Sequence, residues 1–377
     1  MNQFNKITVV LGLLACSSVS YAGTVVADGR GNGMGNTGVT SADYVLAPFY
    51  NPALTAIHRD SDDFGLLVPA VGATLRDTDK SLDTIDDLQD SIDKYNAGNV
   101  SELGKIDQYL DELSDNKSTA VTAGAGLAVA FPLNTLSANF FARGFAEIVA
   151  DPKIDDNADP EQRYQNSKVK MIAFGYYEYG VALAKQVSIV GQDVSLGITP
   201  KYQELRTYKQ SLSVEDFDLD DYDNSETNKN TFNLDLGAVW LVENYRLGVV
   251  VKDLFSKQID TQNIGGVSRY KLNTQMTLSG TYMNEFFAAT MDIDVTKQER
   301  FSELEDETQF VRVGVEGNAF GWAQLRAGYQ TDVQDTLDDE VTVGIGISPG
   351  DLVSIDVAGS YAGDNQFGIS GNLSFTF

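Results

Sequence analysis

The C-terminal segment of the chain alternates between apolar and small or polar side chains and stops on a phenylalanine. From Phe367 to Phe377 every odd position is apolar or glycine, so a strand here has one apolar face and one polar face. A strand of about 9–11 residues that faces lipid on one side and a wet lumen on the other has this pattern. The segment therefore predicts the closing strand of a transmembrane β-barrel.

The first 22 residues have the pattern of a secretory signal peptide. Lys6 provides the positive charge, Ile7–Ala15 provides a short apolar stretch, and a small-x-small site ends at Ala22. A lipoprotein is the competing interpretation, because Cys16 closes an imperfect lipobox. If cleavage follows Ala22, the mature chain has no cysteine and thus no disulfide. The apolar stretch is too short for a transmembrane helix, so membrane residence requires a barrel.

Charge and composition fit an exported barrel. The formal net charge is −27, which excludes nucleic acid as an expected partner, because a phosphate backbone requires Lys and Arg. The 34 glycines, 17 tyrosines and 19 phenylalanines suit strands and the aromatic girdles of a membrane barrel.

Segments of period-2 alternation recur along the chain from Phe64 onward. About 14 of them cover residues 64–73, 120–131, 135–147, 169–184, 193–206, 231–242, 244–253, 272–283, 285–296, 307–317, 320–330, 340–348, 351–361 and 367–377. They predict an all-β membrane protein, namely an antiparallel barrel of about 14 strands over residues 64–377. A soluble β-sandwich also alternates in this way and is the competing architecture.

The connections between these segments favour the barrel. Long polar connections, such as 148–168 and 207–230, take turns with tight ones, such as 132–134 and 349–350. Outer-membrane barrels sort long loops to one side and short turns to the other, whereas a sandwich has no reason to do so.

The first long connection, residues 76–119, changes to helical spacing. Leu82, Ile85, Leu88 and Ile92 recur at helical intervals, and the stretch 96–99 divides the segment into two amphipathic helices. Twelve acidic and five basic residues between positions 76 and 117 predict a strongly acidic extracellular cap. The segment is either a solvated lid on its own apolar stripe, or a docking surface for a partner or lid over a ligand groove.

Residues 23–63 precede the first strand and predict a plug. Gly33, Gly35 and Gly38 formally match a dinucleotide-binding fingerprint, but no strand precedes them and no βαβ unit follows, so that site is rejected. Glycines here are expected to let the chain bend within a barrel lumen. Asn51 is a good N-cap and Pro52 a good first helical residue, which predicts a short helix through His58.

These residues carry a family resemblance. The stretch Gly29–Gly38, together with Asn51, Pro52 and Ala53, resembles the N-terminal hatch of the FadL-type outer-membrane transporters. Residues 58–72 and the acidic helical segment resemble, more specifically, the exported TraF-like plasmid-transfer family. The resemblance implies a 14-stranded barrel in the outer membrane of a Gram-negative bacterium, a plug that holds the Asn-Pro-Ala motif, and passage of hydrophobic compounds. The terminal Phe377 resembles the signal that the barrel assembly machinery recognises.

The lumen is expected to contain charges of both signs, because charges kept away from lipid must be paired or hydrated. We predict ion pairs between plug and wall rather than an open pore of one sign. The residues assigned to this network are Arg30, Asp43, Arg59, Arg143, Arg246, Asp292, Arg312, Glu316 and Arg326. Four aromatic residues, Phe141, Phe145, Phe174 and Tyr176, share the inward phase; they either line an apolar ligand path or pack the plug.

Other chemistry has little support. His58 is the single histidine, so a Ser/His/Asp hydrolase would depend on a residue in the predicted plug, and a zinc site lacks ligands. The acidic run 216–221 departs from a calcium loop at its sixth and twelfth positions. No enzyme activity, cofactor or metal is expected.

Three functions remain open. The first is passive transport of hydrophobic small molecules. The second is a non-transporting envelope component of a conjugal transfer or secretion system that binds partner proteins, and the third, much weaker, is an enzyme. In each case the surroundings are outer-membrane lipid and lipopolysaccharide.

Overall fold

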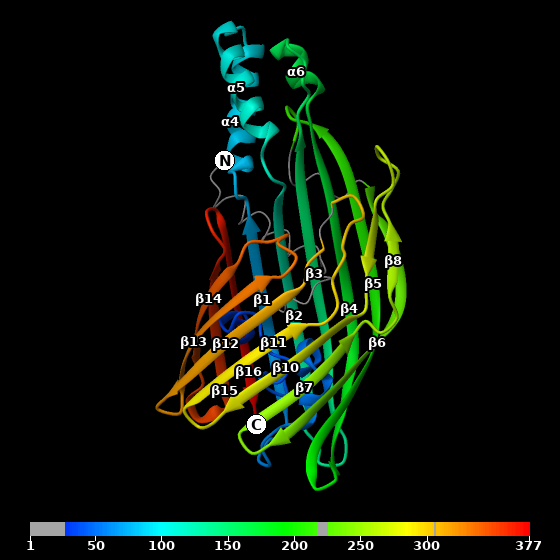
Figure 1. Ribbon diagram of the computed structural model, residues 1–377, viewed down its shortest axis with the longest axis vertical. Coiled ribbons are helices and arrows are strands. Elements are labelled where there is room, and N and C mark those ends of the chain that lie inside the picture. The colour runs from blue at the N-terminus through cyan, green and yellow to red at the C-terminus, as the bar shows by residue number, and fades with distance from the viewer. Residues whose placement is uncertain (1–26, 218–224, 305–306) are drawn as a thin grey trace.

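The computed structural model describes residues 27–217, 225–304 and 307–377, which form a closed antiparallel barrel around a plug (Figure 1). The predicted signal peptide, residues 1–22, and most of the acidic run 216–221 lie outside the described residues. Within the described residues no helix is long and apolar enough to cross a bilayer.

Fourteen strands close the barrel, each paired with its neighbours in chain order, and the first strand pairs with the last. Their bounds are β1 Gly65–Arg76, β2 Thr119–Phe131, β3 Ser137–Lys153, β4 Lys168–Ile189, β5 Gln192–Ser213, β6 Thr227–Val242, β7 Tyr245–Lys252, β10 Gln275–Met283, β11 Phe287–Asp294, β12 Phe310–Ala319, β13 Ala323–Asp332, β14 Glu340–Ile347, β15 Val353–Tyr361 and β16 Gln366–Thr376. The predicted fold class is therefore confirmed, with strand ends displaced by a few residues.

The alternation of side chains has the expected direction. On β16 the apolar Phe367 and Ile369 are exposed on the outer surface, whereas Ser370 and Asn372 are buried inside. The wall therefore has an apolar exterior and a polar interior, as a membrane barrel requires. We call the end with the tight connections the turn end, and the opposite end the loop end.

The wall has an uneven height. Strands β4 and β5 have 22 residues each, whereas β7 and β11 have 8 each, so one side rises well above the other (Figure 1). On the low side the connection after β7 contains a small hairpin, β8 Lys257–Asp260 and β9 Arg269–Leu272. The sequence prediction missed it, since four-residue strands contain too little alternation to be recognised.

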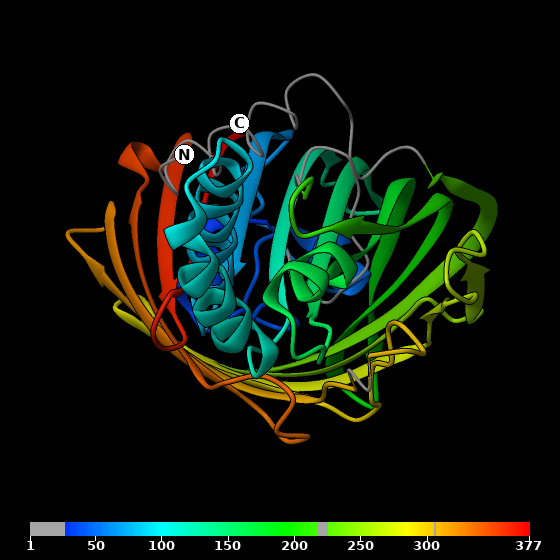
Figure 2. The same cartoon turned by 90° about the horizontal axis from the view of Figure 1, so that it is seen from above.

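The acidic segment forms the two predicted helices, α4 Ser81–Asn96 and α5 Leu103–Ser114, joined by η2 Val100–Glu102. A further short helix, α6 Pro160–Asn166, stands beside them at the loop end (Figures 1 and 2).

The apolar faces of these helices pack on the tall wall. Leu88, Ile92 and Leu110 join one buried cluster with Val169 and Met171 of β4. These two β4 residues share the outward phase of Tyr179, which is exposed lower on the same strand. The expectation of a cap over the barrel is therefore corrected: the helices cover outward-facing side chains above the lipid-facing surface, because those apolar residues need a partner there.

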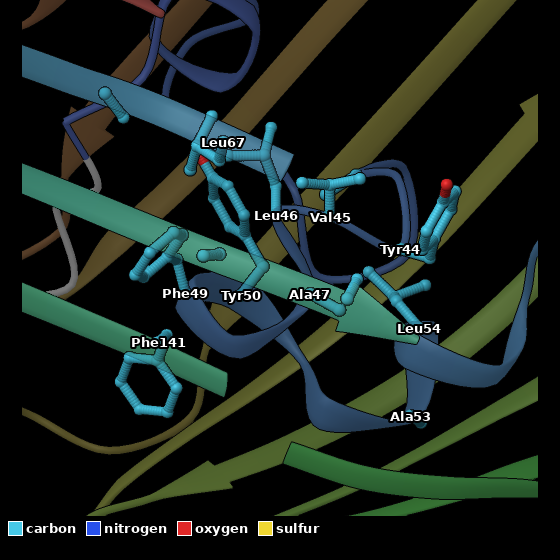
Figure 3. Packing of buried hydrophobic residues seen from close by; sticks show 14 of the residues in the cluster. Tyr44, Val45, Leu46, Ala47, Phe49, Tyr50, Ala53, Leu54, Leu67 and Phe141 are labelled. Carbon is cyan, nitrogen blue, oxygen red and sulfur yellow. The ribbon is translucent and has the colours of Figure 1, made fainter. Parts of the chain in front are cut away.

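The plug fills the lumen toward the turn end. It contains α2 Gly29–Gly33, α3 Ala47–Tyr50 and the 3-10 helix η1 Pro52–Ala56. Its apolar side chains form a core with the inner wall, where Leu46, Phe49 and Leu54 pack near Leu67 of β1 and Phe141 of β3 (Figure 3). The predicted short helix therefore exists and ends at Ala56 rather than at His58.

Candidate functional site

The plug lies directly against wall positions that lack a side chain. A Cβ atom added to Gly328 would lie 2.0 Å from the backbone nitrogen of Gly35, and one added to Gly314 would lie 2.3 Å from the carbonyl oxygen of Met34. At the other end of the plug, a Cβ on Gly197 would lie 2.3 Å from the nitrogen of Ala53. The inner wall therefore has glycine where the plug backbone touches it.

The Asn-Pro-Ala motif is held by hydrogen bonds. The side-chain oxygen of Asn51 accepts from the backbone N–H of Ala53 at 3.0 Å and so caps η1. Its amide nitrogen donates to the carbonyl oxygens of Val39, in the plug, and Val249, in β7, at 3.1 and 3.4 Å. Asn51 is completely buried, so its amide group needs these partners in place of water.

The three glycines of the rejected fingerprint also lie at the interface between plug and wall. Gly35 has a φ of +70° and donates its N–H to Thr342 at 2.8 Å. The N–H groups of Gly38 and Val39 donate to Asp292 at 2.9 and 3.2 Å. Gly33 approaches the backbone of Gly344, since an added Cβ would lie 2.9 Å from its Cα atom.

Replacing Asn51 by alanine should loosen the plug without destroying the barrel. The change removes a helix cap, which contributes about 1 kcal/mol, and two further hydrogen bonds to backbone carbonyl groups. Hydrogen exchange of residues 47–56 should accelerate, whereas exchange in β11–β14 stays as in the parent. Unchanged exchange in η1 would contradict this assignment.

An ion pair joins the plug to the wall at Glu316 of β12. Arg30 of α2 lies 3.2 Å from Glu316 of β12 and 3.9 Å from Asp43 of the plug. Glu316 also accepts from Arg326, which in turn contacts Asp356 at 2.7 Å. A chain of charges thus connects the plug to β12, β13 and β15.

The remaining members of the predicted plug–wall network have other partners. Arg143 pairs with Glu178 of β4 at 2.9 Å, and Arg312 pairs with Asp294 of β11 at 2.9 Å, so both pairs lie within the wall. Arg59 pairs with Asp62 of its own segment. Arg143 and Arg312 therefore pair with carboxylates of adjacent strands, which corrects their assignment to the plug. Arg59 reaches the wall through the hydroxyl group of Thr376 on β16, at 3.3 Å. Arg246 reaches the plug only through the carbonyl oxygen of Thr40, at 3.4 Å.

A second charged cluster lies in the wall beside the plug. The ammonium group of Lys201, fully buried on β5, lies 3.1 Å from Glu178, 2.9 Å from Asp235 and 2.9 Å from Asp253. Gln203 donates to Glu178 and Asp253 at 2.7 and 2.9 Å. The sequence analysis did not identify Lys201, although it shares the inward parity of its strand with Ser195 and Thr199. Asp253 lies just beyond the end of β7, so the alternation of that strand does not predict the direction of its side chain.

The four inward aromatic residues separate into two groups. Phe141 packs edge-on against Phe49 of the plug, with ring centroids 5.7 Å apart. Phe145, Phe174 and Tyr176 instead join a loop-end aromatic cluster with Tyr270 of β9 and Phe301. Tyr270 is fully buried, and its ring stacks on that of Phe174 at 3.5 Å between centroids. The β8–β9 hairpin thereby closes against the tall wall.

Two cavities flank the plug. One of about 90 Å³ lies on the loop side, between the aromatic cluster and the plug, and is lined by Phe145, Arg300 and Asn36 among others. The other, which we call the inner vestibule, has about 400 Å³ at the turn end, with Arg30, Arg246 and His58 in its lining. The lumen is therefore divided by the plug, and the larger space lies on the turn side.

The single histidine, His58, lies in the segment between η1 and β1. The imidazole of His58 contacts the carbonyl oxygen of Arg59 at 3.0 Å and the edge of Tyr44. In residues 27–217, 225–304 and 307–377, no group of three or more His, Cys, Asp or Glu is arranged to hold a metal ion.

Plug docking should depend on pH through Asp28. Burial raises the pKa of this carboxyl to about 6, although the hydrogen bond from Tyr50 acts in the opposite direction. A docked plug then binds more protons than a released one between about pH 4 and pH 6, so docking strengthens as pH falls through 6. Hydrogen exchange of residues 28–50, corrected for intrinsic rates, should be slower at pH 5 than at pH 7.5. D28N should flatten this dependence, and an equal dependence in D28N would refute it.

Comparisons with known proteins agree with this architecture. A family model described as "F plasmid transfer operon, TraF, protein" matches residues 48–294. No curated protein matches the chain.

Several solved structures share the fold. The toluene transporter TbuX of Ralstonia pickettii has a TM-score of 0.58 at 11% identity, over 93% of this chain and 98% of that one. The toluene transporter TodX of Pseudomonas putida has a TM-score of 0.54 at 12% identity, over 95% and 98%. A Pseudomonas aeruginosa FadL homologue has a TM-score of 0.54 at 11% identity, over 96% and 99%. At these identities the likeness establishes a FadL-like outer-membrane barrel fold.

Proposed function

Because the chain belongs to the family described as "F plasmid transfer operon, TraF, protein", and has the fold of the FadL-like barrels, we propose that it is an outer-membrane channel for hydrophobic small molecules. The solved structures that share its fold are described as transporters and channels rather than as enzymes. In this orientation the loop end faces the cell exterior and the turn end faces the periplasm.

The observation that carries the proposal is the order of surfaces along the lumen. A ligand that enters at the loop end first meets the aromatic cluster around Phe174 and Tyr270, then a small cavity, then the plug, and finally the polar inner vestibule. Contact with these buried aromatic rings suits a hydrophobic compound, since burying its surface against them is favourable.

The plug must move for passage to occur. The loop-side cavity of about 90 Å³ is too small for a drug-sized ligand, whose pockets span roughly 300–1,000 Å³. The plug contacts the wall through apolar packing, close approaches at glycines, hydrogen bonds and an ion pair to Glu316, all of which undocking would break. A bulge in β1 between Leu67 and Ala70, which shifts its register with both neighbours, provides a second place where the wall could open.

The surroundings follow from the same proposal. Outer-membrane lipid and lipopolysaccharide would contact the apolar exterior. The terminal Phe377, whose ring is more than half exposed on the turn side, would be recognised by the barrel assembly machinery.

A disulfide that fixes the plug should abolish uptake. The hydroxyl oxygens of Thr40 in the plug and Thr281 in β10 are 2.7 Å apart, so cysteines placed there can form a disulfide. Cys16, in the predicted signal peptide, is the only native cysteine. Cells that express T40C/T281C should take up toluene at the background rate when oxidised and at the parental rate after reduction.

The matched control joins two wall strands instead. Thr281 and Thr290 of β11 have hydroxyl oxygens 2.9 Å apart, so T281C/T290C introduces a similar disulfide and leaves the plug free. This variant should transport under both conditions. Undiminished uptake by oxidised T40C/T281C would contradict the channel proposal. It would favour the alternative, a non-transporting envelope component that binds partner proteins.

A further inference from the structure

One cation of the inner vestibule is not neutralised by a carboxylate. Arg246 lies near the start of β7, and its Nη1 donates to the carbonyl oxygen of Thr40 at 3.4 Å. Among the described residues no carboxylate forms an ion pair with Arg246. Arg30, which lines the same vestibule, has a charge of the same sign. A partly buried guanidinium in this situation is unfavourable unless an anion or water compensates it.

The other arginines of the vestibule are already paired. Arg30 contacts Glu316 at 3.2 Å and Asp43 at 3.9 Å. Arg326 contacts Asp356 at 2.7 Å. The vestibule therefore contains carboxylates, but these pair with arginines other than Arg246.

The vestibule is also polar and large enough for a ligand group. Besides Arg246, its lining includes the hydroxyl groups of Ser41, Ser348 and Ser354, and its volume is about 400 Å³. Nη1 of Arg246 makes the contact with Thr40, so Nε and Nη2 are available as a fork for two oxygens.

We propose that the inner vestibule is an oxyanion-binding site anchored by Arg246. Its ligand is a carboxylate or a similar monovalent oxyanion, either free or as the head group of an amphipathic molecule. The head-group case rests on the proposed channel function, because the molecule would reach the vestibule through the lumen. The free-anion case does not.

Calorimetric titration of the full-length protein in a neutral detergent tests the site. The probes are octanoate, its uncharged analogue octanamide, and acetate. Octanoate should bind the parent, and R246Q should weaken this binding about tenfold or more through loss of a charge-assisted hydrogen bond. R246K should retain part of the affinity. R269Q, which changes an exposed arginine of β9 that is paired with Asp260 at the loop end, should stay close to the parent.

The three probes distinguish a site for free anions from a site for the head group of an amphipathic molecule. Arg246-dependent binding of acetate as well as octanoate identifies a site for free anions, and binding of octanoate alone identifies a head-group site. Octanoate binding that survives R246Q, or equal binding of octanamide, overturns the proposal. R246Q must keep the parental shift between heated and unheated SDS gels, which shows that the barrel is folded.

Failure of this site and failure of the channel are separable. If oxidised T40C/T281C blocks toluene uptake while R246Q binds octanoate like the parent, the channel stands and the oxyanion site does not. If R246Q abolishes octanoate binding while the locked plug still permits uptake, the reverse holds.

Discussion

Replacing Lys201 by methionine should prevent the barrel from reaching its stable form. Its ammonium group is fully buried and lies 2.9–3.1 Å from Glu178, Asp235 and Asp253, two of which are themselves almost completely buried. Methionine fills a similar volume and leaves Glu178 with Arg143, whereas Asp235 and Asp253 lose their ion-pair partner. Removing one partner from a buried ionic group costs about 3–5 kcal/mol.

The measurement is the yield of folded barrel and its melting in SDS. On an SDS gel, unheated K201M should migrate mostly at the position of the heat-denatured protein. Any folded fraction should have a strongly lowered melting temperature. K117M is the matched control, because Lys117 is exposed in the connection between α5 and β2, and it should behave like the parent. A K201M protein as stable as the parent would show that the carboxylates are compensated in another way.

Neutral partners should rescue the defect if charge is its cause. In K201M/D235N/D253N, the two carboxylates that lost their ion-pair partner become amides, while Glu178 keeps Arg143, so much of the lost stability should return. If the triple variant is no more stable than K201M, packing rather than electrostatics accounts for the loss.

Side chains introduced at the glycines under the plug should open the channel. A Cβ at Gly328 would collide with the backbone of Met34 and Gly35, and one at Gly197 would collide with Pro52 and Ala53. Overpacking costs about 1–3 kcal/mol at each site, and the two sites lie at opposite ends of the plug, so their effects should nearly add. The plug backbone cannot move aside without undocking.

We therefore expect G197V/G328V to form a folded barrel with an undocked plug. Planar bilayers should show stepwise ion conductance that the parent lacks, and protease should cleave residues 28–63 faster. Gly317 offers the control, since no atom lies within 4 Å of a Cβ added there, and G317A should remain closed. If G197V/G328V shows no ion conductance and its plug resists protease like that of the parent, the assignment of these glycines is contradicted.

Much of the barrel could be predicted from local pattern. Alternation along β16, from Phe367 to Phe375, assigns one face to lipid because successive side chains point to opposite sides of a strand. The parity of the loop lengths orders the strands, and helical spacing from Leu82 onward places α4. Each of these signals extends over a few neighbouring residues, so no tertiary information is needed to recognise it.

Pairing across the lumen could not be predicted in the same way. The inward direction of Arg143 and Arg312 follows from strand parity, but their partners lie on adjacent strands rather than on the plug. Tyr270 lies on a four-residue strand, and its stacking on Phe174 joins segments almost a hundred positions apart.

The sequence by itself determined the closed barrel, its apolar exterior and the helical segment, because period and loop length are properties of short stretches, and the resemblance of residues 29–53 to the FadL-type hatch predicted the plug. Only the tertiary structure decided which buried charges neutralise one another, where the wall has glycine against the plug, and that Arg246 is left without a carboxylate. Those features depend on distances between strands remote in sequence, and such distances are established only when the barrel closes around its plug.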